Sequence, residues 1–165
     1  MTEQTKHVVS ILVENKPGVL SRVTGLISRH GFNIESLSVG PTEDPTRSRV
    51  TAVVRADPTA FEQITKQLNK LVSVHKINDL TKTQAIEREL VLFKVNAPAE
   101  QRSEVIEIAN LFRANVVDVG RSSLTVEATG DESKLKGMED LLRAYGIKEI
   151  TRTGKIAMSR NSKEV

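Results

Sequence analysis

Hydrophobic and polar residues recur along the chain with two periods, one typical of strands and one typical of helices. Residues 7–13, HVVSILV, are apolar and largely β-branched, which predicts a strand, and residues 14–18, ENKPG, are turn formers. Over residues 19–27 the apolar positions follow the spacing of one helical face, and the basic residues and glycine at 29–31 end this predicted helix. Residues 32–40 alternate and then change phase, which predicts a bulged strand.

The rest of the first half continues the pattern. After a polar loop at 41–48, residues 49–55 predict a strand, Asp57 and Pro58 predict the start of a helix, and residues 72–78 predict another strand. The order is therefore β-α-β-β-α-β, the ferredoxin-like arrangement. The inner face of the second helix is predicted to carry Phe61, Ile64, Leu68 and Leu71.

The second half repeats the same order with unrelated residues. Helices are predicted around 100–113, facing inward with Val105, Ile106, Ala109 and Phe112, and from Asp131, with Leu135, Met138, Leu142 and Tyr145 on one stripe. Strands are predicted at 89–95, 115–119, 122–128 and, as one last strand, near 147–158.

These patterns predict an α+β protein of two tandem ferredoxin-like βαββαβ domains with antiparallel sheets. We expect domain boundaries at 1–80 and 89–165, with the polar residues 81–88 as a linker. Each sheet leaves open edge strands that can pair across a two-fold axis, so we expect a homodimer.

Composition narrows the possible functions. The chain has no cysteine, which excludes disulfides, thiolate metal sites and thiol nucleophiles. The net charge of +3 is spread evenly, and aromatic residues make up only 3%, so we expect no nucleic-acid binding. No apolar run is long enough to cross a bilayer, and residues 1–7 lack the apolar core of a secretion signal. We therefore expect a cytoplasmic protein without a membrane segment.

The best candidate for a binding site is the turn that leads into the first helix. The first turn of a helix has unpaired N–H donors and the positive end of the helix dipole, so it suits a carboxylate, and Gly18 puts no side chain over these donors. Asn15 and Asn33 carry amide donors and acceptors that could hold both charged groups of one amino acid. The alternative is that Pro17 and Gly18 only make a turn and that the asparagines cap it. The apolar neighbours, which favour an aliphatic ligand, are Val13, Val19, Leu20 and Ile34.

These residues also carry a family resemblance. The run VENKPGVLSRVTGLISRHGFNIESLSVG resembles the opening of an ACT domain, specifically that of the small regulatory subunit of acetohydroxyacid synthase (acetolactate synthase). The later stretches EQITKQLNKLVSV, ERELVLFKV, ANLFRANVVDV and SLTVEATG are similar to the same family, so the resemblance covers about residues 7–158.

The resemblance implies a regulatory subunit that is not an enzyme. In this family the partner is a catalytic subunit that holds thiamine diphosphate, FAD and magnesium, so we expect no cofactor and no metal in this chain. The small subunit activates its partner and makes it sensitive to valine or another branched-chain amino acid, the end products of the pathway. The effector lies between two ACT domains, at the positions that are Asn15, Gly18 and Asn33 in this sequence.

The residues give less support to a metal site, to an enzyme active site or to a DNA-binding protein. His7, His30 and His75 lack the close spacing of a metal site, and no acid–base or nucleophile pair of the kind a hydrolase or mutase needs can be found. The alternative function is an amino-acid-sensing domain of a transcriptional regulator, which would need a DNA-reading element that the sequence does not show.

Overall fold

The computed structural model describes residues 3–160 and divides into two compact units. The first unit contains residues 3–86 together with 155–160, and the second contains residues 87–154. In the described part of the chain, no helix combines the length and the apolar content needed to cross a bilayer.

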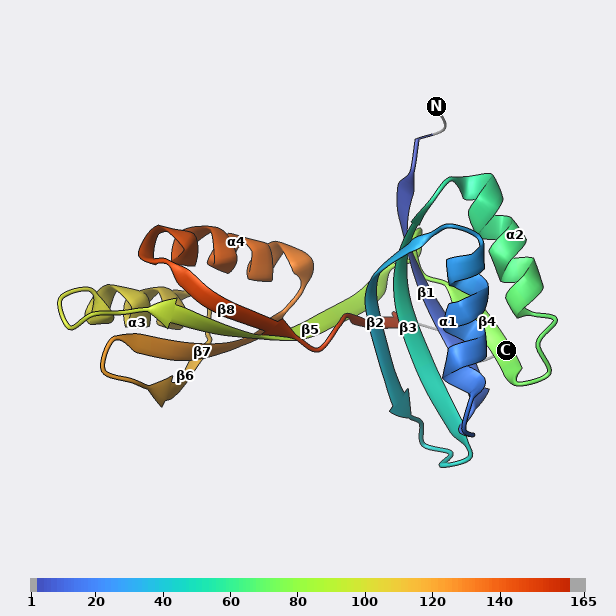
Figure 1. The fold of residues 1–165 in the computed structure, drawn as a ribbon, viewed down its shortest axis with the longest axis horizontal. Helices are drawn as coiled ribbons and strands as arrows, with labels where there is room; N and C mark the ends of the chain where they lie inside the picture. The colour runs from blue at the N-terminus through green and yellow to red at the C-terminus, as the bar shows by residue number, and fades with distance from the viewer. Residues whose placement is uncertain (1–2, 161–165) are drawn as a thin grey trace. The chain divides into compact units, whose positions relative to one another are not determined.

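The first unit is a four-stranded antiparallel sheet with two helices on one face (Figure 1). The strand order β2-β3-β1-β4 and the chain order βαββαβ confirm the predicted fold class. The elements are β1 (Thr5–Glu14), α1 (Val19–Arg29), β2 (Asn33–Pro41), β3 (Arg47–Ala56), α2 (Pro58–Leu68) and β4 (Val74–Asp79).

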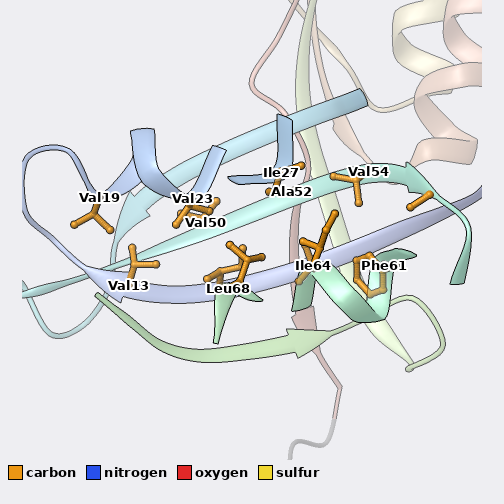
Figure 2. Close-up of a cluster of buried hydrophobic side chains, with 13 residues drawn as sticks. Val13, Val19, Val23, Ile27, Val50, Ala52, Val54, Phe61, Ile64 and Leu68 are labelled. Atoms are coloured by element: carbon orange, nitrogen blue, oxygen red, sulfur yellow. The ribbon is translucent and has the colours of Figure 1, made fainter. Parts of the chain in front are cut away.

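The core of this unit is aliphatic and lies between the sheet and its two helices. Residues at every second position of β1 and β3 pack against the helix residues predicted from the 3.6-residue period. Figure 2 shows Val13, Val50 and Val54 of the strands pointing toward Val23, Ile27, Ile64 and Leu68 of the helices. Each fully buried aliphatic side chain stabilises the fold by roughly 1.5–3 kcal/mol relative to exposure, so this layer holds the helix ends in place.

The predicted bulge in the edge strand β2 is confirmed. Ile34 lies opposite Val54 and Ser36 lies opposite Val53, so Glu35 is the extra residue between them. The carboxylate of Glu35 is ion-paired with the guanidinium of Arg55 and lies 3.9 Å from the ammonium of Lys6. The bulge is therefore fixed by side chains where the backbone ladder is interrupted.

The end of the chain packs differently from the prediction. The single strand predicted near 147–158 is wrong: β8 (Ile147–Arg152) and β9 (Ile156–Ser159) are separate strands, divided at Gly154, whose φ is +88°. Strand β9 pairs with β5 (Ala85–Asn96), which starts inside the expected linker. The second face of the first sheet is partly covered by a small apolar cluster of Val8, Val53, Leu80, Ala157 and Ala85.

The second unit repeats the architecture, with strand order β6-β7-β5-β8. Val105 and Ala109 of α3 (Arg102–Leu111) are buried as predicted, but the inward position predicted for Ile106 is wrong. Ile106 is 36% exposed and Ile108 packs against the core instead, because the buried stripe runs through positions 105, 109 and 112. The remaining elements are β6 (Asn115–Val119), β7 (Ser123–Gly130), α4 (Glu132–Leu142) and the 3-10 turn η1 (Arg143–Tyr145).

Candidate functional site

The turn between β1 and α1 is tied to the loop that joins β2 and β3. The backbone N–H of Asn15 donates to the carbonyl of Thr46 at 2.8 Å, and its side-chain Nδ2 donates to the carbonyl of Pro45 at 3.1 Å. A carboxamide has two N–H donors and a carbonyl oxygen that accepts twice. Asn15 therefore anchors the turn and, since it is exposed, still presents polar groups to solvent.

The supporting loop is held by its own hydrogen bonds. Asp44 Oδ1 accepts from the backbone N–H of Thr46 at 2.9 Å and from its hydroxyl at 2.6 Å. These bonds, helped by the charge of Arg47, lower the pKa of Asp44 below its ordinary value, so it is charged at neutral pH. Residues 41–48 are predicted from the sequence as a polar loop, without a role at the turn. Their role follows from the hairpin, which brings them back to the sheet end where β1 finishes.

Gly18 gives the start of α1 an open, uncapped surface. Its φ of +82° is left-handed, no side chain caps the helix there, and the first turn contains no acidic residue. A Cβ placed on Gly18 would meet nothing within 4 Å. By contrast, α2 and α4 begin with Asp57 and Asp131, each of which accepts a backbone hydrogen bond in its own first turn. The first-turn N–H groups of α1 are thus suited to an external carboxylate.

The four apolar candidates divide into two kinds. Val13 and Val19 are only 2% and 5% exposed and belong to the core, so they can offer a ligand their backbone but little side-chain surface. Ile34 is half-buried against the same core, and Leu20 is 39% exposed at the start of α1. Leu20 and part of Ile34 are therefore the apolar side-chain surface that the four candidates leave accessible.

Asn33 lies far from Asn15 within one chain. Helix α1 has 11 residues, so its two ends are about 16 Å apart at 1.5 Å per residue. The sheet agrees: Glu14, next to Asn15, lies opposite Arg47, whereas Asn33 lies opposite Arg55, about 26 Å further along β3. One chain does not bring the two asparagines together.

The predicted residues therefore form two separate groups. We call Asn15, Gly18 and Leu20 the turn half, and Asn33 and Ile34 the strand half. The turn half lies at the N-terminal end of α1, and the strand half lies at the start of the edge strand β2.

Two of the three histidines have structural partners. His7 is 7% exposed, its ring is stacked on Phe61 at 4.0 Å, and its Nε2 lies 2.9 Å from the Thr5 hydroxyl. His30 Nδ1 lies 2.9 Å from the carbonyl of Leu26 in the preceding helical turn. Across residues 3–160, no three His, Asp or Glu side chains gather as a metal site requires.

Family models match both halves of the chain. Residues 9–76 match the model described as the AHAS small subunit-like ACT domain. Residues 88–161 match the model for the small subunit of acetolactate synthase. The first of these matches includes both the turn half and the strand half.

Individual relatives agree over almost the full length. A probable acetolactate synthase small subunit of Archaeoglobus fulgidus is 54% identical over 159 residues, covering 96% of this chain and 99% of the relative. The acetolactate synthase small subunit of Mycobacterium bovis is 55% identical, covering 96% and 95%. The crystal structure of the acetolactate synthase small subunit from Thermotoga maritima matches with a TM-score of 0.84 at 41% identity, covering 94% of this chain and 98% of that one.

Proposed function

The chain belongs to the family of acetolactate synthase small subunits, and from this premise we propose that it is the feedback sensor of a catalytic acetolactate synthase subunit. Valine or another branched-chain amino acid binds between two copies of the first unit, and the bound state lowers the activity of the catalytic partner. Without the amino acid, the small subunit raises that activity. Both proteins act in the cytoplasm.

The observation that supports this proposal is the chemistry of the two half sites. The turn half offers helix N–H groups at the positive end of a dipole, without an acidic side chain in the first turn, and so favours a carboxylate. The strand half offers the exposed carboxamide of Asn33, whose oxygen can accept a hydrogen bond from an ammonium group. Leu20 of the turn half and Ile34 of the strand half each contribute apolar surface for an aliphatic side chain.

A two-fold pair of first units would join the half sites. Strand β2 is an edge of its sheet, so two copies can pair antiparallel along β2. An antiparallel pair places opposite ends of the two units next to each other, so the turn half of one copy can meet the strand half of the other. The two-fold axis then creates two equivalent sites. This arrangement explains why residues that are so far apart in one chain could serve one small ligand.

Regulation requires that the amino acid bind one arrangement of the pair better than another. A coupling free energy of roughly 1–3 kcal/mol changes the partner's response about 5- to 150-fold, which is ample for end-product control. Thiamine diphosphate, FAD and magnesium belong to the catalytic subunit in this proposal. The small subunit contributes no reacting group.

Calorimetric titration of the full chain with valine, leucine and isoleucine tests the proposal, with lysine as a control that has the same backbone charges but a cationic side chain. We expect saturable binding of at least one branched-chain amino acid, with one site per chain and no binding of lysine. The preferred ligand should also inhibit the enzyme reconstituted from both subunits. Absence of binding by all three branched-chain amino acids would contradict the proposal.

A further inference from the structure

The last described residues of the chain are bound to the first unit next to the strand half. We call residues 155–160 the return segment. The backbone N–H of Lys155 donates to Ser36 Oγ at 2.8 Å, and Ala157 is buried in the cluster with Val8, Val53 and Leu80. At its end, the N–H of Arg160 donates to the carbonyl of Gln84 at 2.8 Å. The contacts that dock the return segment therefore include a hydrogen bond at its start, apolar packing and the pairing of β9 with β5 in its middle, and a backbone hydrogen bond at its end.

Ser36 occupies a special position in β2. It is the first residue after the bulge at Glu35, three residues beyond Asn33, and it lies opposite Val53. At a bulge the ladder hydrogen bonds are interrupted, so the position of the strand depends more on its side-chain contacts. A ligand that holds Asn33 and Ile34 acts directly on the strand segment that carries the Ser36 hydroxyl.

The return segment continues directly from the second unit. Thr153 of that unit donates its N–H to the carbonyl of Leu90 at 3.1 Å, and Leu90 in turn donates its N–H to the Thr153 hydroxyl at 3.1 Å. Only Gly154 separates Thr153 from Lys155, and its φ of +88° is a conformation that few other residues adopt. The Ser36 to Lys155 hydrogen bond is thus two residues from a backbone contact inside the second unit.

We propose that Ser36 is a positioning residue that couples effector binding at the strand half to the docking of the return segment. A bound amino acid fixes the start of β2, and this strengthens the hydrogen bond from Lys155 to Ser36. This inference rests on the proposed function, because it requires a ligand at Asn33. It adds a route by which occupancy of the first unit reaches the chain segment that leads into the second.

Amide hydrogen exchange of Lys155, measured by NMR on the full chain with and without saturating valine, tests the coupling. In the wild type, valine should slow exchange of this amide. Ser36→Ala removes the acceptor, so exchange should become roughly two- to tenfold faster, the range expected for one net hydrogen bond, and the response to valine should disappear. Ser36→Thr retains a hydroxyl and should restore both properties.

Thermodynamic linkage supplies a second readout that a merely structural role would not produce. If valine strengthens the contact by some factor, the contact must strengthen valine binding by the same factor. The Kd of valine for Ser36→Ala should therefore rise by a factor comparable to the slowing that valine causes at Lys155. Ser38→Ala is the matched control, because Ser38 lies two residues further along β2, opposite Thr51 and on the same face.

The possible outcomes separate this inference from the proposed function. If valine binds the wild type but leaves Lys155 exchange unchanged, or if Ser36→Ala and Ser38→Ala behave alike, the coupling is refuted and the sensor function stands. If none of the three branched-chain amino acids binds the wild type, both fail together.

Discussion

At the scale of single residues, Gly18 combines two properties that no other residue type supplies together. Its left-handed φ of +82° starts α1, and it places no side chain over the first-turn N–H groups, of which that of Val19 donates to the carbonyl of Lys16 at 3.4 Å. Asn15, by contrast, also stabilises the fold, since its side-chain amide donates a hydrogen bond to the carbonyl of Pro45. The geometry of Asn15 is therefore compatible both with a residue that only stabilises the turn and with one that also binds a ligand. Substitutions at Gly18 separate effects on binding from effects on folding more cleanly.

Gly18→Asp should weaken amino-acid binding while the fold remains. The new carboxylate would lie beside that of the ligand, and repulsion between like charges at about 4 Å, about 1 kcal/mol in water and about 4 kcal/mol near a protein surface, weakens binding by about fivefold to several hundredfold. The left-handed φ adds a strain of roughly 1–2 kcal/mol for a non-glycine residue, but the space around a new Cβ is open. Calorimetry with valine and inhibition of the reconstituted enzyme measure the effect.

Gly18→Asn is the matched control for this variant, because asparagine has nearly the same shape as aspartate, tolerates the left-handed conformation and carries no charge. We expect the asparagine variant to bind valine much more tightly than the aspartate variant. Equal affinities for the two variants would show that no ligand carboxylate lies at this turn.

At the scale of elements, helix α4 carries a buried charge that the hydrophobic pattern did not predict. The side chain of Glu139 is only 9% exposed, and it accepts from Arg143 Nη2 and, at 2.7 Å, from Arg152 Nη2 of β8. Burial raises the pKa of Glu139, but the hydrogen bonds from Arg152 and Arg143 more than offset this, so the pKa is lowered from its ordinary 4.5. The carboxylate therefore joins α4 to the sheet of the second unit.

Glu139→Gln should destabilise the second unit by about 1–3 kcal/mol, because it leaves two arginine contacts without their charged partner. The pKa of Glu139 is lower in the folded state than in the unfolded state, so its contribution is fully present above pH 4.5 and is lost as the pH falls through the lower folded value. Thermal unfolding of the wild type and of Glu139→Gln between pH 3 and 7 should therefore show a difference in Tm that becomes smaller as the pH falls.

Glu62→Gln provides the comparison for this experiment. Glu62 also forms an ion pair within a helix, 2.7 Å from the ammonium of Lys66, but both side chains are about two-thirds exposed. Exposed pairs of this kind add little to stability, so we expect almost no change in Tm. A Glu139→Gln variant as stable as Glu62→Gln at neutral pH would contradict the role assigned to the α4 contact.

At the scale of the whole molecule, the separation of the turn half from the strand half decides how the site is built. Residues at opposite ends of α1 can serve one ligand only if two copies of the chain contribute to it. Under the proposed function, the site is then a property of the assembly, and each chain is part of two sites. A site shared by two chains can therefore be distinguished from a site within one chain by mixing variant subunits.

Mixing two inactive variants should restore binding. Asn15→Ala and Asn33→Ala homodimers each lack one half of every site, whereas a mixed dimer has one intact site and one that lacks both asparagines. After random exchange of subunits, half the dimers are mixed, so about a quarter of all sites should bind valine. Calorimetric stoichiometry before and after exchange measures this fraction, and binding that stays absent in the mixture would exclude a shared site.

Much of the fold could be predicted from local sequence. The βαββαβ repeat follows from hydrophobic periodicity, the helix starts from Asp57 and Asp131, and the bulge from a change of phase in residues 32–40. The main errors concern Ile106, which points away from the buried stripe of Val105, Ala109 and Phe112, and the single strand predicted near 147–158. The second error depends on residues distant in the sequence, since β9 pairs with β5, whereas the position of Ile106 follows from the local helical period.

The sequence by itself determined the two α+β repeats and the residue types of the candidate site, because these depend on side-chain spacing and on the backbone preferences of glycine, proline and asparagine. Only the tertiary structure decided that Asn15 rests on Pro45, that Asn15 and Asn33 lie at opposite ends of α1, and that residues 155–160 return to the first unit. The physical reason is that strand pairing and burial join residues far apart along the chain, and no local pattern records which distant surfaces meet.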